Sequence, residues 1–377
     1  MPPALTTFLD GQQDSSGTLV VIFLRGGADG LNLVVPHGDD GYYRARPNLG
    51  IRRENLLELD GFFGLNPLLA PLYPWWQSGQ LTLVHGTGSE DETRSHFAAQ
   101  DFMERGGLAA GGWLGRFLRV RPDAGQSPLT AVAIGPQLPE SLRGAPSCAA
   151  IQSLDDFGLG DHLPPNFLPQ LAALYQTAPG LLAPAAHSAL AALQRIDALR
   201  QTAAAPASRA TYGPDDFSVG LRQVARLIKG QVGLQAATLD LNGWDSHITQ
   251  ASLLASPLQR LAQGLHAFAS DLGPATLART PIVVLTEFGR RVAENSASGT
   301  DHGRGSALFI LGGGLPHTGK VQANWADLAS SPLVGPGDLP VTTNYRDVLA
   351  PALRRLAPAI DLRKVFPGHA FNSLVPS

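Results

Sequence analysis

Histidine and carboxylate side chains follow several apolar segments of this chain. The segment PIVVLT (281–286) is followed at once by Glu287 and, after a Gly/Ser-rich stretch, by Asp301 and His302. The run AATLDL is followed by N-G-W-D-S-H, which contains Asp245 and His247. Imidazole and carboxylate are the groups with which proteins bind divalent transition metals. If the fold brings these side chains together, they predict a metal site.

Two further candidates follow other apolar runs. Asp29 lies in R-G-G-A-D-G-L-N, and His96 lies in T-R-S-H-F beside Ser95. Each candidate has a simpler explanation when it is taken alone, because Asp29 could be a turn residue and His96 an ordinary core or surface histidine. Taken as a set, we interpret them as functional. The candidate metal ligands are Asp29, His96, Asp245, His247, Glu287, Asp301 and His302.

Several carboxylates at one edge of a sheet would repel one another. Either their pKa values rise or cations compensate the charge. The interleaved imidazoles favour Zn²⁺ first and Mn²⁺ or Fe next, over Mg²⁺ or Ca²⁺ alone. The set could surround one ion completely or two ions partially, and two ions about 4 Å apart suit the hydrolysis of phosphate-like esters.

Ester hydrolysis also needs a nucleophile and a way to hold an anion. Ser95 is the candidate nucleophile. Alternatively, a metal-bound water is the nucleophile and Ser95 is an ordinary helix residue. Arg290, together with Arg25 and Arg94, could hold a tetrahedral anion through paired hydrogen bonds. We expect at least one of these three arginines to be structural.

The elements that must position these residues alternate between strand and helix patterns. Apolar runs at 18–25, 81–86, 130–135, 236–241, 281–288 and 307–314 are typical of buried parallel strands. Helical patterns cover 89–107, with Ser89 as N-cap and Gly106 as stop, and 248–273. The alternation predicts a doubly wound α/β domain, in which ligands bind at the carboxyl ends of the strands. We interpret 1–377 as one domain, with 1–17 as a polar leader and 164–230 as a helical insertion.

Composition narrows the classes of function. The net charge of −3 argues against a nucleic-acid binder, and a single cysteine, Cys148, excludes a disulfide framework or a cysteine-based metal site. The sequence has no apolar stretch of membrane-spanning length. As written it also lacks a signal peptide, which predicts a cytoplasmic protein, or a periplasmic or exported one if an upstream signal was trimmed. Composition leaves the oligomeric state open.

The ordered motifs resemble a known family. F-L-R-G-G-A-D-G-L-N, T-R-S-H-F-A-A-Q-D-F-M-E, G-W-D-S-H, L-T-E-F-G-R and Y-R-D-V-L-A, between about residues 18 and 370, are similar to the bacterial family called domain of unknown function 1501. That family looks like a branch of the alkaline phosphatase and sulfatase superfamily. The resemblance implies a three-layer α/β/α sandwich with a mostly parallel central sheet and a metal cluster at its carboxyl edge.

The resemblance also implies roles for single residues. Asp29 stands where the first-strand metal aspartate would be, Ser95 near the nucleophile, and His302 at the late metal histidine. Asp245 and His247 resemble an aspartate–histidine metal pair, although their spacing is shorter than usual.

This chain departs from the superfamily pattern at two places. Glu287 and Phe288 replace the usual Asp-His, which removes one imidazole; His96 or Asp301 could supply the missing ligand, or the second ion could be absent. The chain lacks the Cys-x-Pro-x-Arg motif, so a sulfatase-type nucleophile is unsupported.

These features predict a metal-dependent hydrolase of phosphate or sulfate esters that acts on a small-molecule or glycan anionic ester. The alternative is a catalytically inactive relative that binds an anionic or carbohydrate ligand or a partner protein, with Trp75–Trp76 and Tyr42–Tyr43 as stacking platforms unless they pack in the core. A Rossmann-type oxidoreductase is disfavoured because the first glycines lack the G-x-G-x-x-G order.

Overall fold

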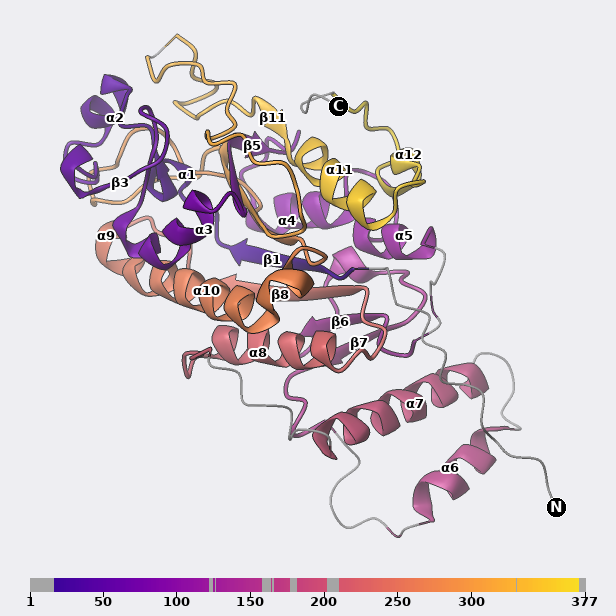
Figure 1. Cartoon of the computed structure of the whole chain (residues 1–377). Coiled ribbons are helices and arrows are strands. Elements are labelled where there is room, and N and C mark those ends of the chain that lie inside the picture. Colours follow the sequence, from indigo (N-terminus) through magenta and orange to yellow (C-terminus); the bar gives the residue numbers. More distant parts are fainter. Residues whose placement is uncertain are drawn as a thin grey trace, which may run out of the picture.

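A large, mostly parallel sheet forms the centre of the protein. The computed structural model describes residues 17–121, 125, 127–157, 164, 166–176, 182–201, 210–329 and 331–372, so the expected leader lies almost entirely outside the described residues. Within these ranges eight strands form the main sheet (Figure 1). In order across the sheet they are β11 (Thr343–Asn344), β5 (Leu81–Gly88), β10 (Ser306–Leu311), β9 (Ile282–Thr286), β1 (Leu19–Arg25), β8 (Ala236–Asn242), β6 (Ala131–Ile134) and β7 (Cys148–Ile151).

One strand of this sheet is reversed. β10 runs antiparallel to both of its neighbours, β9 and β5, whereas the other pairings are parallel. Its amino end therefore lies at the edge where the other strands have their carboxyl ends. A second, small antiparallel sheet contains β2 (Val34–Val35), β4 (Gly64–Leu65) and β3 (Leu57–Glu58).

Helices pack against both faces of the main sheet, which explains why its strands are continuous apolar runs. Side chains on one face of β1, such as Ile22, share a buried cluster with α8 (Asp216–Lys229) and α10 (Ala255–Leu277). Those on the other face, such as Phe23, pack with α5 (Trp113–Arg119), α11 (Tyr345–Leu356) and α12 (Leu362–Val365). Figure 1 shows these two groups of helices on opposite sides of the strands. The predicted α/β class with a mostly parallel sheet is confirmed.

Seven further helices lie within the described residues. They are α1 (Gly30–Leu33), α2 (Asp40–Ala45), α3 (Tyr73–Gln77), α4 (His96–Arg105), α6 (Phe167–Gln176), α7 (Leu182–Gln201) and α9 (Gln250–Leu253), with 3₁₀ turns at Arg53–Asn55, Pro67–Leu72 and Glu140–Leu142. The helix predicted for 248–273 is divided between α9 and α10, and α10 is kinked at Gly273. Residues 164–230 contain α6, α7 and α8, and α8 lies in the core; that this stretch is an insertion stays a prediction.

The expected start of the helix at 89–107 is wrong. α4 begins at His96, with Ser95 rather than Ser89 at the N-cap position, and ends as predicted at Gly106, whose φ is 70°. Side chains in the preceding segment bond to nearby backbone: Ser89 Oγ accepts from the Asp91 amide, and Asp91 accepts from the Thr93 amide. Such local bonds compete with helix formation and hold residues 89–94 in a loop.

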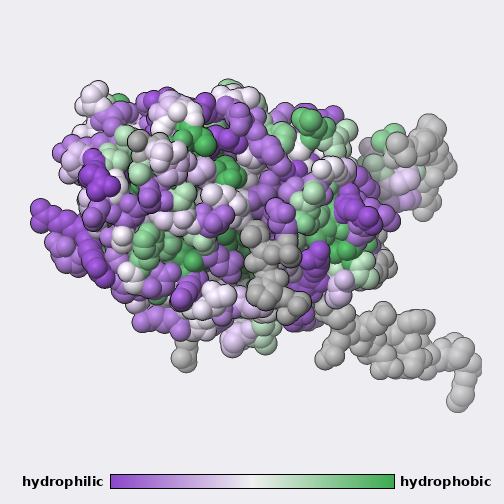
Figure 2. Space-filling view, turned by 90° about the horizontal axis from the view of Figure 1, so that it is seen from above, coloured by the Kyte–Doolittle hydropathy of each residue, from purple (hydrophilic) through white to green (hydrophobic). Residues whose placement is uncertain are grey.

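The surface mixes polar and apolar side chains. On the face drawn in Figure 2 polar residues predominate and apolar ones form small separate groups. Among the described residues, no helix combines the length and apolarity that crossing a bilayer requires.

The start of α8 generates a prediction about stability and pH. Asp215 accepts hydrogen bonds from the Ser218 amide and Arg260 Nε, at 3.2 and 3.0 Å. Burial would raise the pKa of Asp215, but these bonds outweigh it and lower the pKa. Asp215→Ala should reduce the free energy of unfolding by about 1 kcal/mol at pH 7, measured by urea denaturation.

The same contact predicts how this difference depends on pH. Because the folded-state pKa of Asp215 is lowered, its contribution is complete above the unfolded pKa of about 3.9 and is lost as pH falls through the folded value. Asp215→Asn keeps a capping oxygen without the charge and should lose less stability than Asp215→Ala at pH 7. A difference between wild type and Asp215→Asn that grows on acidification would contradict this account.

Candidate metal centre

Three connections, β5 to α4, β8 to α9 and β9 to β10, meet at one edge of the main sheet. His96 follows β5, Asp245 and His247 follow β8, and Glu287 follows β9. His302 precedes β10, and it reaches the same edge because β10 runs antiparallel to its neighbours. The topology therefore brings together residues that are up to about two hundred positions apart in the sequence.

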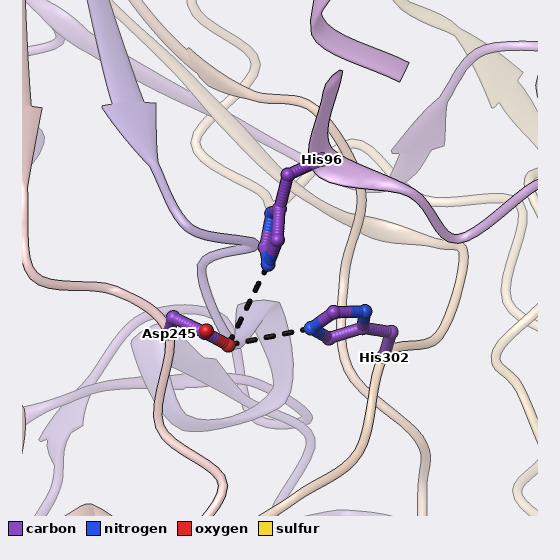
Figure 3. Close-up of side chains that lie close together, drawn as sticks. All are labelled: His96, Asp245 and His302. Atoms are coloured by element: carbon purple, nitrogen blue, oxygen red, sulfur yellow. Dashed lines mark hydrogen bonds and ion pairs between the residues drawn. The ribbon is translucent and has the colours of Figure 1, made fainter. Parts of the chain in front are cut away.

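The centre of the cluster is one carboxylate oxygen, Asp245 Oδ1. It lies 3.6 Å from His96 Nε2 and 3.3 Å from His302 Nε2, as Figure 3 shows, and 3.1 Å from His247 Nε2. His96, Asp245 and His302 each offer one ligand atom, and these three atoms lie within 4.8 Å of one another. Ligand atoms around tetrahedral zinc, with bonds of about 2.0–2.1 Å, are roughly 3.3 Å apart. The spacing of the cluster fits a single ion.

Hydrogen bonds on the far side of two imidazoles fix which nitrogen carries the proton. His96 Nδ1 lies 2.8 Å from Glu287 Oε1, and His302 Nδ1 lies 2.9 Å from the Arg94 carbonyl oxygen. An ionised carboxylate and a carbonyl can only accept, so both Nδ1 atoms donate and both Nε2 atoms of the neutral rings present lone pairs. His96 Nε2 is buried without a hydrogen-bond partner in the described structure.

His247 adds a third imidazole to the cluster. Its Nε2 lies 2.9 Å from His302 Nε2, and its Nδ1 lies 3.5 Å from Asp301 Oδ1. Asp301 also pairs with Arg291 at 3.3 Å. Two imidazole nitrogens at this separation need a proton or a cation between them, because two facing lone pairs would repel.

Buried groups on the protein side of the cluster hold the candidate ligands in place. Glu287, whose side chain is fully buried, accepts from the Gly26 amide at 2.9 Å and from Gln100 Nε2 at 2.8 Å as well as bonding His96. Gly26, just after β1, has a positive φ and lies against the backbone of the loop that carries Asp245. A Cβ added at Gly26 would lie 2.5 Å from the Asp245 amide nitrogen. Phe288 packs over the rings of His96 and His302, with 4.9 Å between ring centroids in each pair.

Arg290 is buried beneath the cluster. It donates to the carbonyls of Gly27 and Thr300 at 2.7 and 3.0 Å, and its Nη2 bonds Asp245 Oδ1 at 2.7 Å. The guanidinium is thus engaged with backbone and with a candidate ligand. This geometry favours a positioning role over the anion contact expected from the sequence.

Asp245, Glu287, His96 and His302 each have a shifted pKa with an identifiable physical cause. Burial would raise the pKa of Asp245, but the hydrogen bond and charge of Arg290 lower it to about 2. Burial is likewise outweighed at Glu287, where hydrogen bonds lower the pKa. The bond with Glu287 raises the pKa of His96, whereas burial lowers the pKa of His302. Both carboxylates are therefore ionised at neutral pH.

Not every predicted residue joins the cluster. Asp29 is buried in an ion pair with Arg46 and accepts a further hydrogen bond from Gln250, so its oxygens are engaged away from the histidines. Ser95 is exposed at the N-cap position of α4, and its hydroxyl makes no capping bond. The other two candidate arginines are in ion pairs, Arg25 with Glu104 and Asp240, and Arg94 with Asp338.

Sequence reasoning missed several supporting residues. Gln100 is four positions after His96 on a helix, so the two share a face, and this spacing could have identified it. Phe288 is adjacent to Glu287 but gives no chemical signal. The aspartate that holds Arg94, Asp338, lies 244 positions away, and nothing in the sequence links the two.

The comparison with known proteins places the chain in a family. Residues 82–370 match the model of the family described as "Protein of unknown function (DUF1501)". The chain belongs to this family. The part that matches it contains the whole histidine–carboxylate cluster and leaves out Asp29. A search of curated proteins found no match to the chain.

The pairing of Asp29 generates a prediction. Asp29→Ala leaves the Arg46 guanidinium buried without its counter-charge, which should cost about 3–5 kcal/mol of stability, measured by chemical denaturation. The protein that remains folded should bind Zn²⁺ as tightly as wild type. Asp301→Ala, at a half-exposed carboxylate, is the matched control and should cost far less stability. Loss of Zn²⁺ binding with unchanged stability would instead make Asp29 a ligand.

The contact between Gln100 and Glu287 generates another prediction. Gln100→Leu removes a donor that orients Glu287 and, through it, His96, so Zn²⁺ affinity should fall about 10-fold or more. Competition with a chromophoric chelator measures this change. Ala98→Leu, at an exposed position of the same helix, should leave the affinity unaltered. Equal affinities for the two variants would remove Gln100 from the account.

Proposed function

We propose that this protein is a metal-dependent hydrolase of anionic esters, with one divalent ion held by His96, Asp245 and His302. The observation that carries the proposal is the convergence of two Nε2 atoms of fixed tautomer on a single carboxylate oxygen. Two imidazoles and one carboxylate suit Zn²⁺ first, with Mn²⁺ or Fe as alternatives, and Mg²⁺ or Ca²⁺ less well.

The ion, when bound, would act as a Lewis acid and lower the pKa of water in its open position. Asp245 is kept ionised and oriented by Arg290. His247, which is less buried than His96 and His302, is placed to hold a proton at Nε2 while Asp301 lies beside its Nδ1. A histidine oriented by a carboxylate is a common arrangement for general acid–base work.

The nucleophile and the anion contacts are further parts of the proposal. Ser95 adjoins His96 in the chain and is open to solvent, which supports it as a nucleophile beside the alternative of water. The ion would provide the charge that attracts the substrate, because Arg25, Arg94 and Arg290 are all in ion pairs. The substrate class is a small-molecule or glycan phosphate or sulfate ester.

We further infer a three-layer α/β/α sandwich of the alkaline phosphatase type. Its support is the helices on both faces of a mostly parallel sheet and the cluster at the carboxyl ends of the strands. Phe288, which stands where the superfamily has the histidine of its Asp-His pair, packs on the rings of His96 and His302. Asp29 forms an ion pair with Arg46. Both features support one ion over two.

A second candidate is a catalytically inactive relative that binds an anionic or carbohydrate ligand or a partner protein. The absence of an unpaired guanidinium among the three candidate arginines favours it. The aromatic pairs add little support, because Tyr42 and Trp76 are buried and the Trp75 indole is bonded to His266.

A screen of phosphate monoesters, phosphate diesters and sulfate esters with Zn²⁺- or Mn²⁺-loaded protein separates the two candidates. The hydrolase proposal predicts turnover that falls by about 10²-fold or more in His302→Ala, because a ligand of the ion is lost. Ser95→Ala should lower turnover without changing metal affinity if the hydroxyl is the nucleophile. Leu174→Ala, at an exposed site on α6, is the neutral control. Metal binding without turnover of any ester would support the inactive relative.

A further inference from the structure

A cavity outside the histidine cluster is lined in part by Asp29 and Gln250. Its volume is about 450 Å³, within the range of small-molecule sites. It is enclosed by α1, the 49–55 loop, the 3₁₀ turn Pro67–Leu72, α9 and the start of α10. Figure 1 draws α9 at the start of α10, at this end of the molecule.

The wall of this cavity is mainly apolar. Leu33, Leu49, Leu68, Leu254 and Leu258 supply much of it, and its lining contains no lysine or arginine. An anionic ligand would lose its hydration there without gaining a counter-charge.

The polar residues of the floor already have partners. The side chain of Asn32 accepts from Tyr42 and Arg46 and donates to the Leu49 carbonyl, and that of Asn66 donates to the Asn32 carbonyl. Asp29 is paired with Arg46. A ligand in the cavity therefore meets few polar atoms in need of a hydrogen bond, and the lining fits a neutral, largely apolar molecule.

One residue connects the cavity to the histidine cluster. Gln250 lines the cavity, donates to Asp29, and accepts from Ser246 Oγ at 3.0 Å and Thr300 Oγ1 at 2.6 Å. Ser246 lies between Asp245 and His247, and Thr300 precedes Asp301. All three members of this hydrogen-bonded bridge, Gln250, Ser246 and Thr300, are buried. A ligand that orders Gln250 would also order the two loops that carry the cluster.

We propose that this cavity binds a small neutral molecule with a hydrocarbon chain or ring, and that its occupancy is linked through Gln250 to the affinity of the metal centre. The proposal has two halves: the binding half is that the cavity binds the small molecule, and the linked half is that this binding changes the affinity of the metal centre. The linked half rests on the proposed function, and the binding half does not. Because linkage is reciprocal, a ligand that favours the ordered bridge tightens metal binding, and the metal tightens ligand binding.

The binding half is tested with 1-octanol on the full chain in EDTA, by titration calorimetry. We expect saturable binding, and at least about tenfold weaker binding of octanoate, which adds a charge to the same chain. Ala251→Trp fills the mouth from an exposed lining position and should weaken 1-octanol binding about tenfold or more, whereas Ser252→Trp, one residue away and outside the lining, should not.

A second variant keeps the test decisive if Ala251→Trp disturbs folding. Ala251→Glu should also weaken 1-octanol binding, and Ser252→Glu is its control. No saturable binding to wild type, equal binding of octanoate, or unchanged binding in both Ala251 variants would overturn the site.

The linked half is tested by Zn²⁺ competition with a chelator, with and without saturating 1-octanol. We expect about fivefold tighter Zn²⁺ binding with 1-octanol in wild type. In Thr300→Val, which removes a hydrogen bond of the bridge outside the cavity lining, this gain should shrink while 1-octanol still binds in EDTA. Equal Zn²⁺ affinity with and without 1-octanol in wild type would overturn the linkage. Failure of Zn²⁺ to bind at all would overturn the proposed function, and the EDTA experiment would still decide the cavity.

Discussion

The cluster depends on the charge balance around Asp245 Oδ1. This oxygen has one guanidinium below it and three imidazole nitrogens around it. Two of those imidazoles are hydrogen-bonded through Nδ1 to acceptors, so their Nε2 lone pairs face the carboxylate. Lone pairs that converge on a negative oxygen are unfavourable in a partly buried site unless positive charge lies between them. One divalent ion would satisfy Nε2 of His96, Nε2 of His302 and Asp245 Oδ1 together.

The sheet makes this convergence possible. β5, β8 and β9 are parallel, so their carboxyl ends lie at one edge of the sheet. The amino end of β10 lies at the same edge because this strand is reversed. The second set of contacts, from Glu287, Arg290 and the glycine turn after β1, ties the loops to the strand ends. Ligands held on rigid strand ends with bonded partners behind them keep their geometry before any ion arrives.

Much of this arrangement could be predicted from the sequence, because buried strands leave a strong apolar signature and polar residues at their ends stand out. His96, Asp245, His247, Glu287, Asp301 and His302 all follow or precede such runs, and the structure brings them together. The reversal of β10 could not be predicted, because an apolar run does not encode its direction. A loop before a parallel strand would have placed His302 at the opposite edge.

Other features needed tertiary information. The partner of Asp29, Arg46, is only 17 positions away, but no local pattern distinguishes a buried ion pair from a metal ligand. α4 begins later than the sequence pattern predicts, because side-chain bonds between residues 89 and 93 replace a turn of helix. The shortest strands, such as β2 and β3, are too brief to carry a periodic signal.

Anomalous X-ray scattering from crystals grown with stoichiometric Zn²⁺ tests the central claim most directly. The account predicts one zinc peak, bonded at about 2.0–2.2 Å to Nε2 of His96, Nε2 of His302 and an oxygen of Asp245. A zinc peak bonded to other residues, or no peak near Asp245 at full zinc loading, would contradict it.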